Sequence, residues 1–267
     1  MVKTGCVKTN GFETDYCRFG TGSKPFVIVP GISIQSVMSA KDMVANSYVV
    51  FKDDFTVYLF DRRKVVPNPY SIYDMADDTA AVFKELGLTD AYLFGASQGG
   101  MVTMVLAARY PRLVKKAILG STSAHITDAM FQKTLAVWIS LAKRQDSAAL
   151  YDAFGRSIYP PDVYMQFKDI FASVSKTVTN EELEKFIILA ESLRDFDCRD
   201  ELEKIHCPVL ALGSNDDEMF GSDPTKEIAK KLGKRSDFSM HLYDGYGHAA
   251  FDTAPDYRQR MYDFCMA

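Results

Sequence analysis

The stretch LFGASQGGM, residues Leu93–Met101, places Ser97 between an apolar run and a predicted helix. A strand that ends just before Ser97 and a helix that begins at Gln98 require a very sharp turn, and the residue at its apex is often held in a strained backbone conformation. Gly95 and Gly99 flank the serine in the pattern Gly-x-Ser-x-Gly, where small residues make such a turn possible. The stretch therefore predicts an exposed serine nucleophile rather than an inert turn residue.

Other short apolar runs rich in β-branched and aromatic residues predict further strands that are buried on both faces. Helical patterns alternate with these runs, and the helix that starts after Ser71 has a capping carboxylate at Asp74 and a stop at Gly87. This alternation predicts an α/β fold with a mostly parallel sheet. The predicted strands cover residues 25–31, 55–61, 91–97, 114–121, 207–214 and 238–245.

The pattern changes after Ser123, where apolar residues recur at helical spacing for about seventy residues. One series of these residues is preceded by a Thr179/Glu182 capping box. We therefore predict one α/β core domain, residues 1–124 and 200–267, with a helical lid inserted at residues 125–199.

Composition limits the partners and the location. The 267-residue chain has a net charge of −4 and a pI near 5.6, with no basic patch, so nucleic acid is not an expected partner. No run of apolar residues is long enough for a signal peptide or a membrane span, which predicts a cytoplasmic protein without membrane attachment. Five cysteines without paired spacing indicate neither a disulfide framework nor a metal site. No dinucleotide, phosphate or zinc motif is present, so we expect no cofactor; the oligomeric state stays open.

A serine nucleophile needs a histidine base, and we expect the base after an acid in the chain. His248 is the candidate, because it stands in the glycine-rich loop DGYGHAAFD after the last predicted strand. The other three histidines fit structural, surface or lid positions, with His125 also able to line a substrate pocket. They are His125, His206 and His241.

The acid is expected in GSNDDE, after the strand that begins at Cys207. We favour Asp216 over the alternative Asp217, because a short turn off the strand should point that position toward the histidine loop. Two main-chain N–H groups should hold the oxyanion. We expect them from Gln98, at the positive end of a helix, and from Ile32, which follows a Pro-Gly pair, with Ser33 as the alternative to Ile32.

Taken together, GASQGG, GSNDDE and GYGHAAF resemble the nucleophile elbow, acid loop and histidine loop of the α/β-hydrolase superfamily, in the matching order. The resemblance covers essentially the whole chain and implies the α/β-hydrolase fold with a helical lid between strands 6 and 7. It is nearest to small bacterial lidded hydrolases such as carboxylesterases, lactonases and carbon–carbon bond hydrolases. Two departures are Pro30-Gly31, where members often have His-Gly, and DRRKVVPNP after the second predicted strand, where many have Asp-x-Arg-Gly-x-Gly-x-Ser.

We expect a carboxylesterase that uses a Ser-His-Asp triad and an acyl-enzyme on a small to medium, largely apolar ester. The alternatives are an acyltransferase, a lactonase or a carbon–carbon bond hydrolase on the same triad, or a receptor that keeps the triad and barely turns over. Arg62 and Arg63 could bind a substrate carboxylate, although a salt-bridged or solvated pair is the simpler interpretation. The lid aromatics that could line the pocket are Phe131, Trp138, Phe154, Tyr159, Tyr164 and Phe167.

Overall fold

The computed structural model describes residues 1–126, 129–221 and 223–267. Its strands are β1 (Lys3–Lys8), β2 (Glu13–Phe19), β3 (Lys24–Val29), β4 (Phe55–Phe60), β5 (Ala91–Ala96), β6 (Val114–Gly120), β7 (Val209–Ser214) and β8 (Phe238–Tyr243). The helices of the core are α1 (Lys41–Ser47), α2 (Ile72–Leu86), α3 (Gln98–Arg109), α8 (Asp223–Leu232), α9 (Ala250–Thr253) and α10 (Tyr257–Met266). Between β6 and β7 lie α4 (Ala129–Lys143), α5 (Ser147–Ile158), α6 (Pro161–Val174) and α7 (Asn180–Glu191).

In the described part of the chain the strands form one sheet of order β1-β2-β4-β3-β5-β6-β7-β8. β2 pairs antiparallel with both β1 and β4, and all pairs from β4 to β8 are parallel. The predicted mostly parallel sheet is therefore confirmed.

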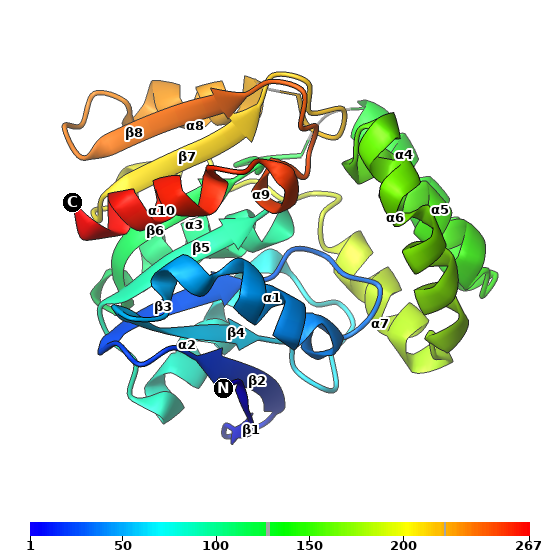
Figure 1. Cartoon of the computed structure of the whole chain (residues 1–267), viewed down its shortest axis with the longest axis horizontal. Coiled ribbons are helices and arrows are strands. Elements are labelled where there is room, and N and C mark those ends of the chain that lie inside the picture. Colours follow the sequence, from blue (N-terminus) through cyan, green and yellow to red (C-terminus); the bar gives the residue numbers. More distant parts are fainter. Residues whose placement is uncertain (127–128, 222) are drawn as a thin grey trace.

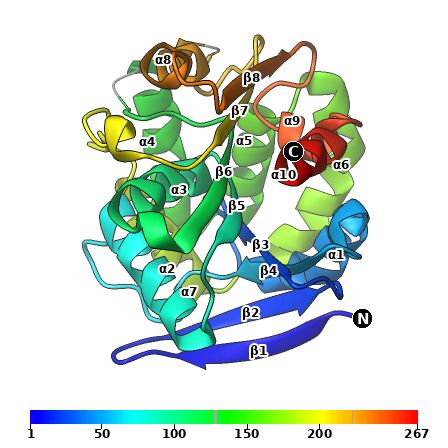
Figure 2. The ribbon, with the colours of Figure 1, turned by 90° about the vertical axis from the view of Figure 1, so that its left-hand side faces the viewer.

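Helices cover both faces of the sheet, with α2, α3 and α8 on one face and α1 and α10 on the other (Figures 1 and 2). Each face has its own apolar cluster. One cluster includes Met101 and Leu106 of α3, and the other includes Tyr257 and Met261 of α10. The central parallel strands are thus buried on both sides, which explains why the sequences of β4, β5 and β7 are almost continuously apolar.

Local capping explains where two helices begin. Ser71 and Asp74 form a reciprocal capping box at α2, and Gly87 ends that helix in the left-handed conformation at φ 65°. Thr179 and Glu182 form the same box at α7. Both boxes satisfy main-chain N–H groups that a helix start leaves without partners.

The helices α4 to α7 form a layer that faces the carboxyl ends of the strands (Figure 1). They correspond to the stretch of about seventy residues after Ser123 in which apolar residues recur at helical spacing. The apolar series at residues 131–141, 163–174 and 183–193 match α4, α6 and α7. The sequence pattern did not separate α5, which begins after the capping side chain of Asp146. The edge strand β1 and its neighbour β2 were also missed.

Candidate active site

Ser97 lies between β5 and α3, where the chain turns from strand to helix. Its φ of 54° and ψ of −125° belong to a region that side-chain-bearing residues rarely adopt. The turn is held by a hydrogen bond from Ser97 N to Gly120 O at 2.9 Å and by another from Thr122 Oγ1 to Ser97 O at 2.7 Å. The strained apex expected from the sequence is therefore present.

The glycines on either side of Ser97 are required by close backbone approach. A Cβ on Gly95 would stand 2.2 Å from Gly99 O, and a Cβ on Gly99 would stand 2.1 Å from Val29 O. Real side chains do not tolerate such distances. The first turn of α3 thus packs directly on the ends of β3 and β5, which holds Ser97 in place.

His248 lies in the loop between β8 and α9 and is 2% exposed. Its Nδ1 is 2.9 Å from Oδ2 of Asp217, which is 5% exposed. The other carboxylate oxygen of Asp217 accepts the main-chain N–H groups of Met219 at 2.8 Å and Phe220 at 3.1 Å. This fixed carboxylate favours an Nδ1–H imidazole, which leaves Nε2 free to accept a proton.

The expected pairing of Asp216 with His248 is wrong, and the alternative, Asp217, occupies that place. Asp216 instead accepts the main-chain N–H groups of Gly245 and Gly247, each at 3.0 Å. The two neighbouring carboxylates therefore have different partners: one orients the imidazole, and the other fixes the backbone of the loop that carries it.

The end of β7 explains why Asp217, and not Asp216, reaches His248. Asn215 continues the pairing with β8 through a hydrogen bond from its N to Tyr243 O at 2.8 Å, and its side chain donates to Asp244 Oδ1 at 2.8 Å. The chain therefore leaves the sheet one residue later than a strand ending at Ser214 implies. Asp217, rather than its predecessor, then reaches the imidazole.

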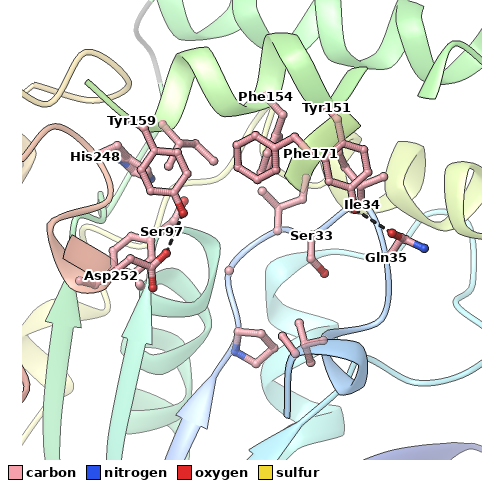
Figure 3. Close-up of a pocket in the computed structure, with 18 of the residues that line it drawn as sticks. Ser33, Ile34, Gln35, Ser97, Tyr151, Phe154, Tyr159, Phe171, His248 and Asp252 are labelled. Atoms are coloured by element: carbon pink, nitrogen blue, oxygen red, sulfur yellow. Dashed lines mark hydrogen bonds between the residues drawn. The ribbon is translucent and has the colours of Figure 1, made fainter. Parts of the chain in front are cut away.

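Ser97 and His248 line one cavity of about 300 Å³, called here the Ser97 cavity (Figure 3). Its walls come from the loop after β3, from the lid helices and from the chain around α9. Among the described residues no hydrogen bond joins the Ser97 hydroxyl to His248; in hydrolases without substrate this contact is often long. The aromatic lining residues are Trp138, Tyr151, Phe154, Tyr159, Phe171 and Phe251.

Some of the expected pocket residues line the Ser97 cavity and others do not. Trp138 does, as expected. His125 instead lines a separate cavity of about 710 Å³, and its Nδ1 lies 3.1 Å from Glu227 Oε2. Among the other predicted lid aromatics, Phe154 and Tyr159 line the Ser97 cavity, whereas Phe131, Tyr164 and Phe167 do not. Tyr151 and Phe171 were not among the predicted pocket residues; Tyr151 belongs to the missed helix α5.

The expected oxyanion donors lie beside the nucleophile. Ile32 and Ser33 line the Ser97 cavity, and a Cβ on Gly31 would stand 3.2 Å from Ala96 O, which shows how closely this loop passes the turn. Gln98 begins α3, where a helix leaves its first N–H groups without helical acceptors. Within the described residues neither Ile32 N nor Gln98 N donates to a protein acceptor.

Arg62 is neither a surface residue nor part of the Ser97 cavity. It is 7% exposed, and its Nη2 donates to Pro30 O at 2.7 Å and to Gln98 Oε1 at 3.3 Å. Burial lowers the pKa of the Arg62 guanidinium. Arg63 forms a salt bridge, as the simpler interpretation of the pair predicted, with its Nη1 3.5 Å from Asp78 Oδ2. Arg62 therefore joins the loop after β3 to the first residue of α3.

The helices α4 to α7 and their connections are hydrogen-bonded to three of the loops that carry site residues. These loops are the turn at Ser97, the segment after β3 and the loop of His248. The hydrogen bonds run from Gln98 Nε2 to Leu189 O (2.9 Å), from Tyr151 OH to Gln35 Oε1 (2.9 Å) and from Ala249 N to Ile158 O (3.2 Å).

The described residues offer neither a metal site nor a membrane-spanning helix. No group of three or more histidine, cysteine, aspartate or glutamate side chains in this part of the chain is arranged to hold a metal ion. No helix in the same residues is long and apolar enough to span a membrane.

A family model described as alpha/beta hydrolase fold matches residues 24–255. The chain belongs to the α/β-hydrolase family. This match confirms the predicted fold class and the resemblance to the α/β-hydrolase superfamily. The protein is therefore a hydrolase.

Two curated relatives indicate the range of chemistry near this α/β hydrolase. The chain is 23% identical over 208 residues to 3-oxoadipate enol-lactonase 2 of Acinetobacter baylyi, covering 76% of this chain and 75% of the relative. It is 28% identical over 193 residues to a Caulobacter segnis protein with the name "Putative carbamate hydrolase RutD", covering 71% of each.

Two solved structures share the fold. An α/β hydrolase from a Medee basin deep-sea metagenome library, MGS-M2, superimposes with a TM-score of 0.85 at 20% identity, covering 98% of each chain. The enol-lactonase from Burkholderia xenovorans LB400 gives a TM-score of 0.84 at 20% identity, covering 98% of this chain and all of the other. At these identities the likeness concerns the fold of this α/β hydrolase.

Proposed function

We propose that this α/β hydrolase cleaves a small, largely apolar carboxylic ester with Ser97 as nucleophile, His248 as base and Asp217 as the orienting acid. The observation that carries the proposal is the buried Asp217–His248 pair next to a strained serine in one aromatic-lined cavity. Strain at a nucleophile and a buried carboxylate–imidazole pair are both expected where a serine hydroxyl must be activated.

The proposed reaction has two steps. Ser97 Oγ attacks the ester carbonyl while its proton passes to His248 Nε2, and the imidazolium formed is stabilised by Asp217. The tetrahedral intermediate then collapses: the bond to the alcohol breaks, and the alcohol leaves with the proton from His248. A water molecule, activated by the same imidazole, attacks the acyl-enzyme and releases the carboxylic acid and the free serine.

The N–H groups of Ile32 and Gln98 hold the oxyanion in this proposal. Their lack of a protein acceptor supports the assignment, because each is available to a substrate oxygen. A donor of this kind is typically worth about 3 kcal/mol in the transition state. Arg62 acts as a positioning residue, since it binds the main chain just before Gly31 and the side chain of Gln98.

The substrate class rests on the lining of the Ser97 cavity. Six aromatic side chains favour an apolar acyl or alcohol group over a sugar. The relatives named as an enol-lactonase and a carbamate hydrolase make a lactone and a carbamate the next candidates on the same triad. Transfer of the acyl group to an alcohol or amine, or cleavage of a carbon–carbon bond, would use the same nucleophile and base.

The remaining expectations on location and organisation are proposals too. We propose that residues 125–199 act as a lid over a core of residues 1–124 and 200–267. We also propose that the protein works in the cytoplasm on a small molecule, without nucleic acid or membrane as a partner; free thiols at all five cysteines agree with a reducing compartment.

The test compares wild type with Ser97→Ala on p-nitrophenyl acetate, butyrate and octanoate, a γ-lactone and an alkyl carbamate, together with labelling by a fluorophosphonate. We expect the fluorophosphonate to label wild type only, and the short esters to turn over fastest. Labelling with preferred turnover of the lactone or the carbamate would keep the nucleophile and replace the substrate class. Labelling without turnover would favour transfer, carbon–carbon cleavage or a receptor role, and no labelling would overturn the nucleophile.

A further inference from the structure

The Ser97 cavity contains one acidic side chain, that of Asp252. Among the described residues that line this cavity, the others are apolar, aromatic or neutral polar, apart from His248, and no lysine or arginine is present. Asp252 belongs to α9, four residues after His248, and Figure 3 shows its carboxylate on the same side of the cavity as Ser97. A substrate held at Ser97 therefore lies near a wall carboxylate that no lysine or arginine of the lining neutralises.

The contacts of Asp252 leave this charge accessible from the cavity. Oδ2 accepts the hydroxyl of Tyr159 at 3.0 Å, and Oδ1 is 3.9 Å from Nη2 of Arg258. Arg258 is not a lining residue; its guanidinium lies over the Tyr48 ring, and its Nη1 donates to the main-chain oxygen of Asp252. The Asp252 side chain is 46% exposed, so the long ion pair with Arg258 leaves the carboxylate uncovered.

The surroundings of Asp252 are suited to a cation. Tyr159 and Phe251, its neighbours in the cavity wall, offer aromatic rings, and faces of such rings attract ammonium groups. Loss of solvation beside these walls raises the pKa of the Asp252 carboxyl, an effect that the Tyr159 hydroxyl and Arg258 oppose. An arriving cation would stabilise this carboxylate, whereas an arriving carboxylate would repel it.

We propose that Asp252 is a specificity-determining residue that makes the Ser97 cavity accept substrates with a cationic nitrogen group and reject substrates with a carboxylate. This inference rests on the proposed function, because it assigns the substrate class of the same site. It requires a positive group on the acyl or the alcohol part of the ester, close enough to contact the wall formed by Asp252, Tyr159 and Phe251.

The kinetic test uses pairs of esters that have the same shape and differ in charge. On the alcohol side these are the butyrates of choline and of 3,3-dimethylbutan-1-ol. On the acyl side they are the p-nitrophenyl esters of 4-(trimethylammonio)butyric acid and 5,5-dimethylhexanoic acid, with mono-p-nitrophenyl adipate as the anion. The readout is the ratio of kcat/KM for the cationic and the neutral ester, which cancels any general effect of a variant on catalysis.

In wild type we expect the cationic ester to be preferred by about tenfold or more in at least one pair, and the adipate monoester to be the poorest acyl substrate. Asp252→Asn should bring the ratio close to one. Tyr159→Phe removes the hydroxyl and keeps the charge, so its ratio should remain cation-favouring. A ratio that is already near one in wild type, or one that Asp252→Asn leaves unchanged, would overturn the proposal.

Measuring ligand binding without hydrolysis distinguishes a failure of this proposal from a failure of the proposed function. If no ester is hydrolysed and the fluorophosphonate fails to label Ser97, the proposed function is wrong. Separate titrations of choline and 3,3-dimethylbutan-1-ol, followed by ligand-observed NMR, still test whether the Ser97 cavity prefers a cation. Tighter binding of choline that is lost in Asp252→Asn would support cation selection by itself. Equal binding of the two alcohols, or a preference that survives in Asp252→Asn, would overturn it.

Discussion

Replacing Asp217 by asparagine keeps the size of the side chain and removes the charge next to His248. The two side chains meet at 2.9 Å and are at most 5% exposed, so water screens their interaction weakly. When the imidazole is protonated, unit charges about 4 Å apart attract by about 4 kcal/mol at an effective dielectric constant of about 20. Since about 1.4 kcal/mol corresponds to a factor of ten, we expect kcat to fall by about a thousandfold.

A second effect of Asp217→Asn acts in the same direction. The asparagine amide can donate a hydrogen bond to Nδ1 of His248, which would leave the proton on Nε2 and so block the proposed base. The loss of orientation together with the lost charge can bring the total toward about ten-thousandfold. Thermal unfolding of the variant should still show a folded protein, because Met219 and Phe220 keep the amide oxygen as an acceptor.

The matched control is Asp216→Asn, one residue earlier. Its amide retains an oxygen for Gly245 or Gly247 but loses one of the two acceptors, which should cost about 1 kcal/mol of stability and reduce kcat by less than about tenfold. Both variants are assayed for kcat and KM on p-nitrophenyl butyrate, or on whichever substrate wild type prefers. A loss larger than a hundredfold in Asp216→Asn with near wild-type activity in Asp217→Asn would refute the geometric argument.

Three further predictions concern the packing at Gly99, the buried Arg62 and the charge of Asp252. Gly99→Ala puts a methyl group 2.1 Å from Val29 O, so we expect a loss of about 3 kcal/mol or more in the free energy of unfolding; an unchanged melting temperature would contradict it. Arg62→Met should lower kcat by about tenfold to a hundredfold with a smaller change in KM, whereas Arg63→Met at the surface should not. Because the pKa of Asp252 is raised, its charge is lost as the pH falls through that raised value, so the preference for cationic esters should decline at acidic pH in wild type and stay flat in Asp252→Asn.

The fold could be predicted from the sequence wherever burial leaves a strong pattern. The central parallel strands are covered by helices on both faces, so most of their residues are apolar, and the capping residues of α2 and α7 are local in sequence. β1 and β2 lack that signal. Both lie at the antiparallel end of the sheet, where KTGCVK has a single buried residue and ETDYCRF has three, and polar residues occupy much of each strand.

The site could be predicted to the level of its loops. Ser97 and His248 follow from motifs in which glycines mark the turns, whereas the choice between Asp216 and Asp217 depends on where β7 stops pairing. That point is set by the hydrogen bond between Asn215 and Tyr243, a contact across the sheet that spacing along the chain does not encode. The residues that line the cavity are harder to predict, because helical periodicity identifies the buried face of a helix but does not distinguish the buried residues that line the cavity from those that pack in the core.

Gln98 shows why the lid and the nucleophile should be considered together. Its main-chain N–H is the oxyanion donor of the proposed mechanism, while its fully buried side chain donates to Leu189 O at the end of α7 and accepts from Arg62. A displacement of α7 would therefore pull on the residue that directly follows Ser97. Because Arg62 also holds Pro30, the same displacement would reach the loop of the second proposed donor. In the proposed mechanism, α7 and Arg62 thus help to hold the two donors relative to each other, which preorganises the oxyanion site.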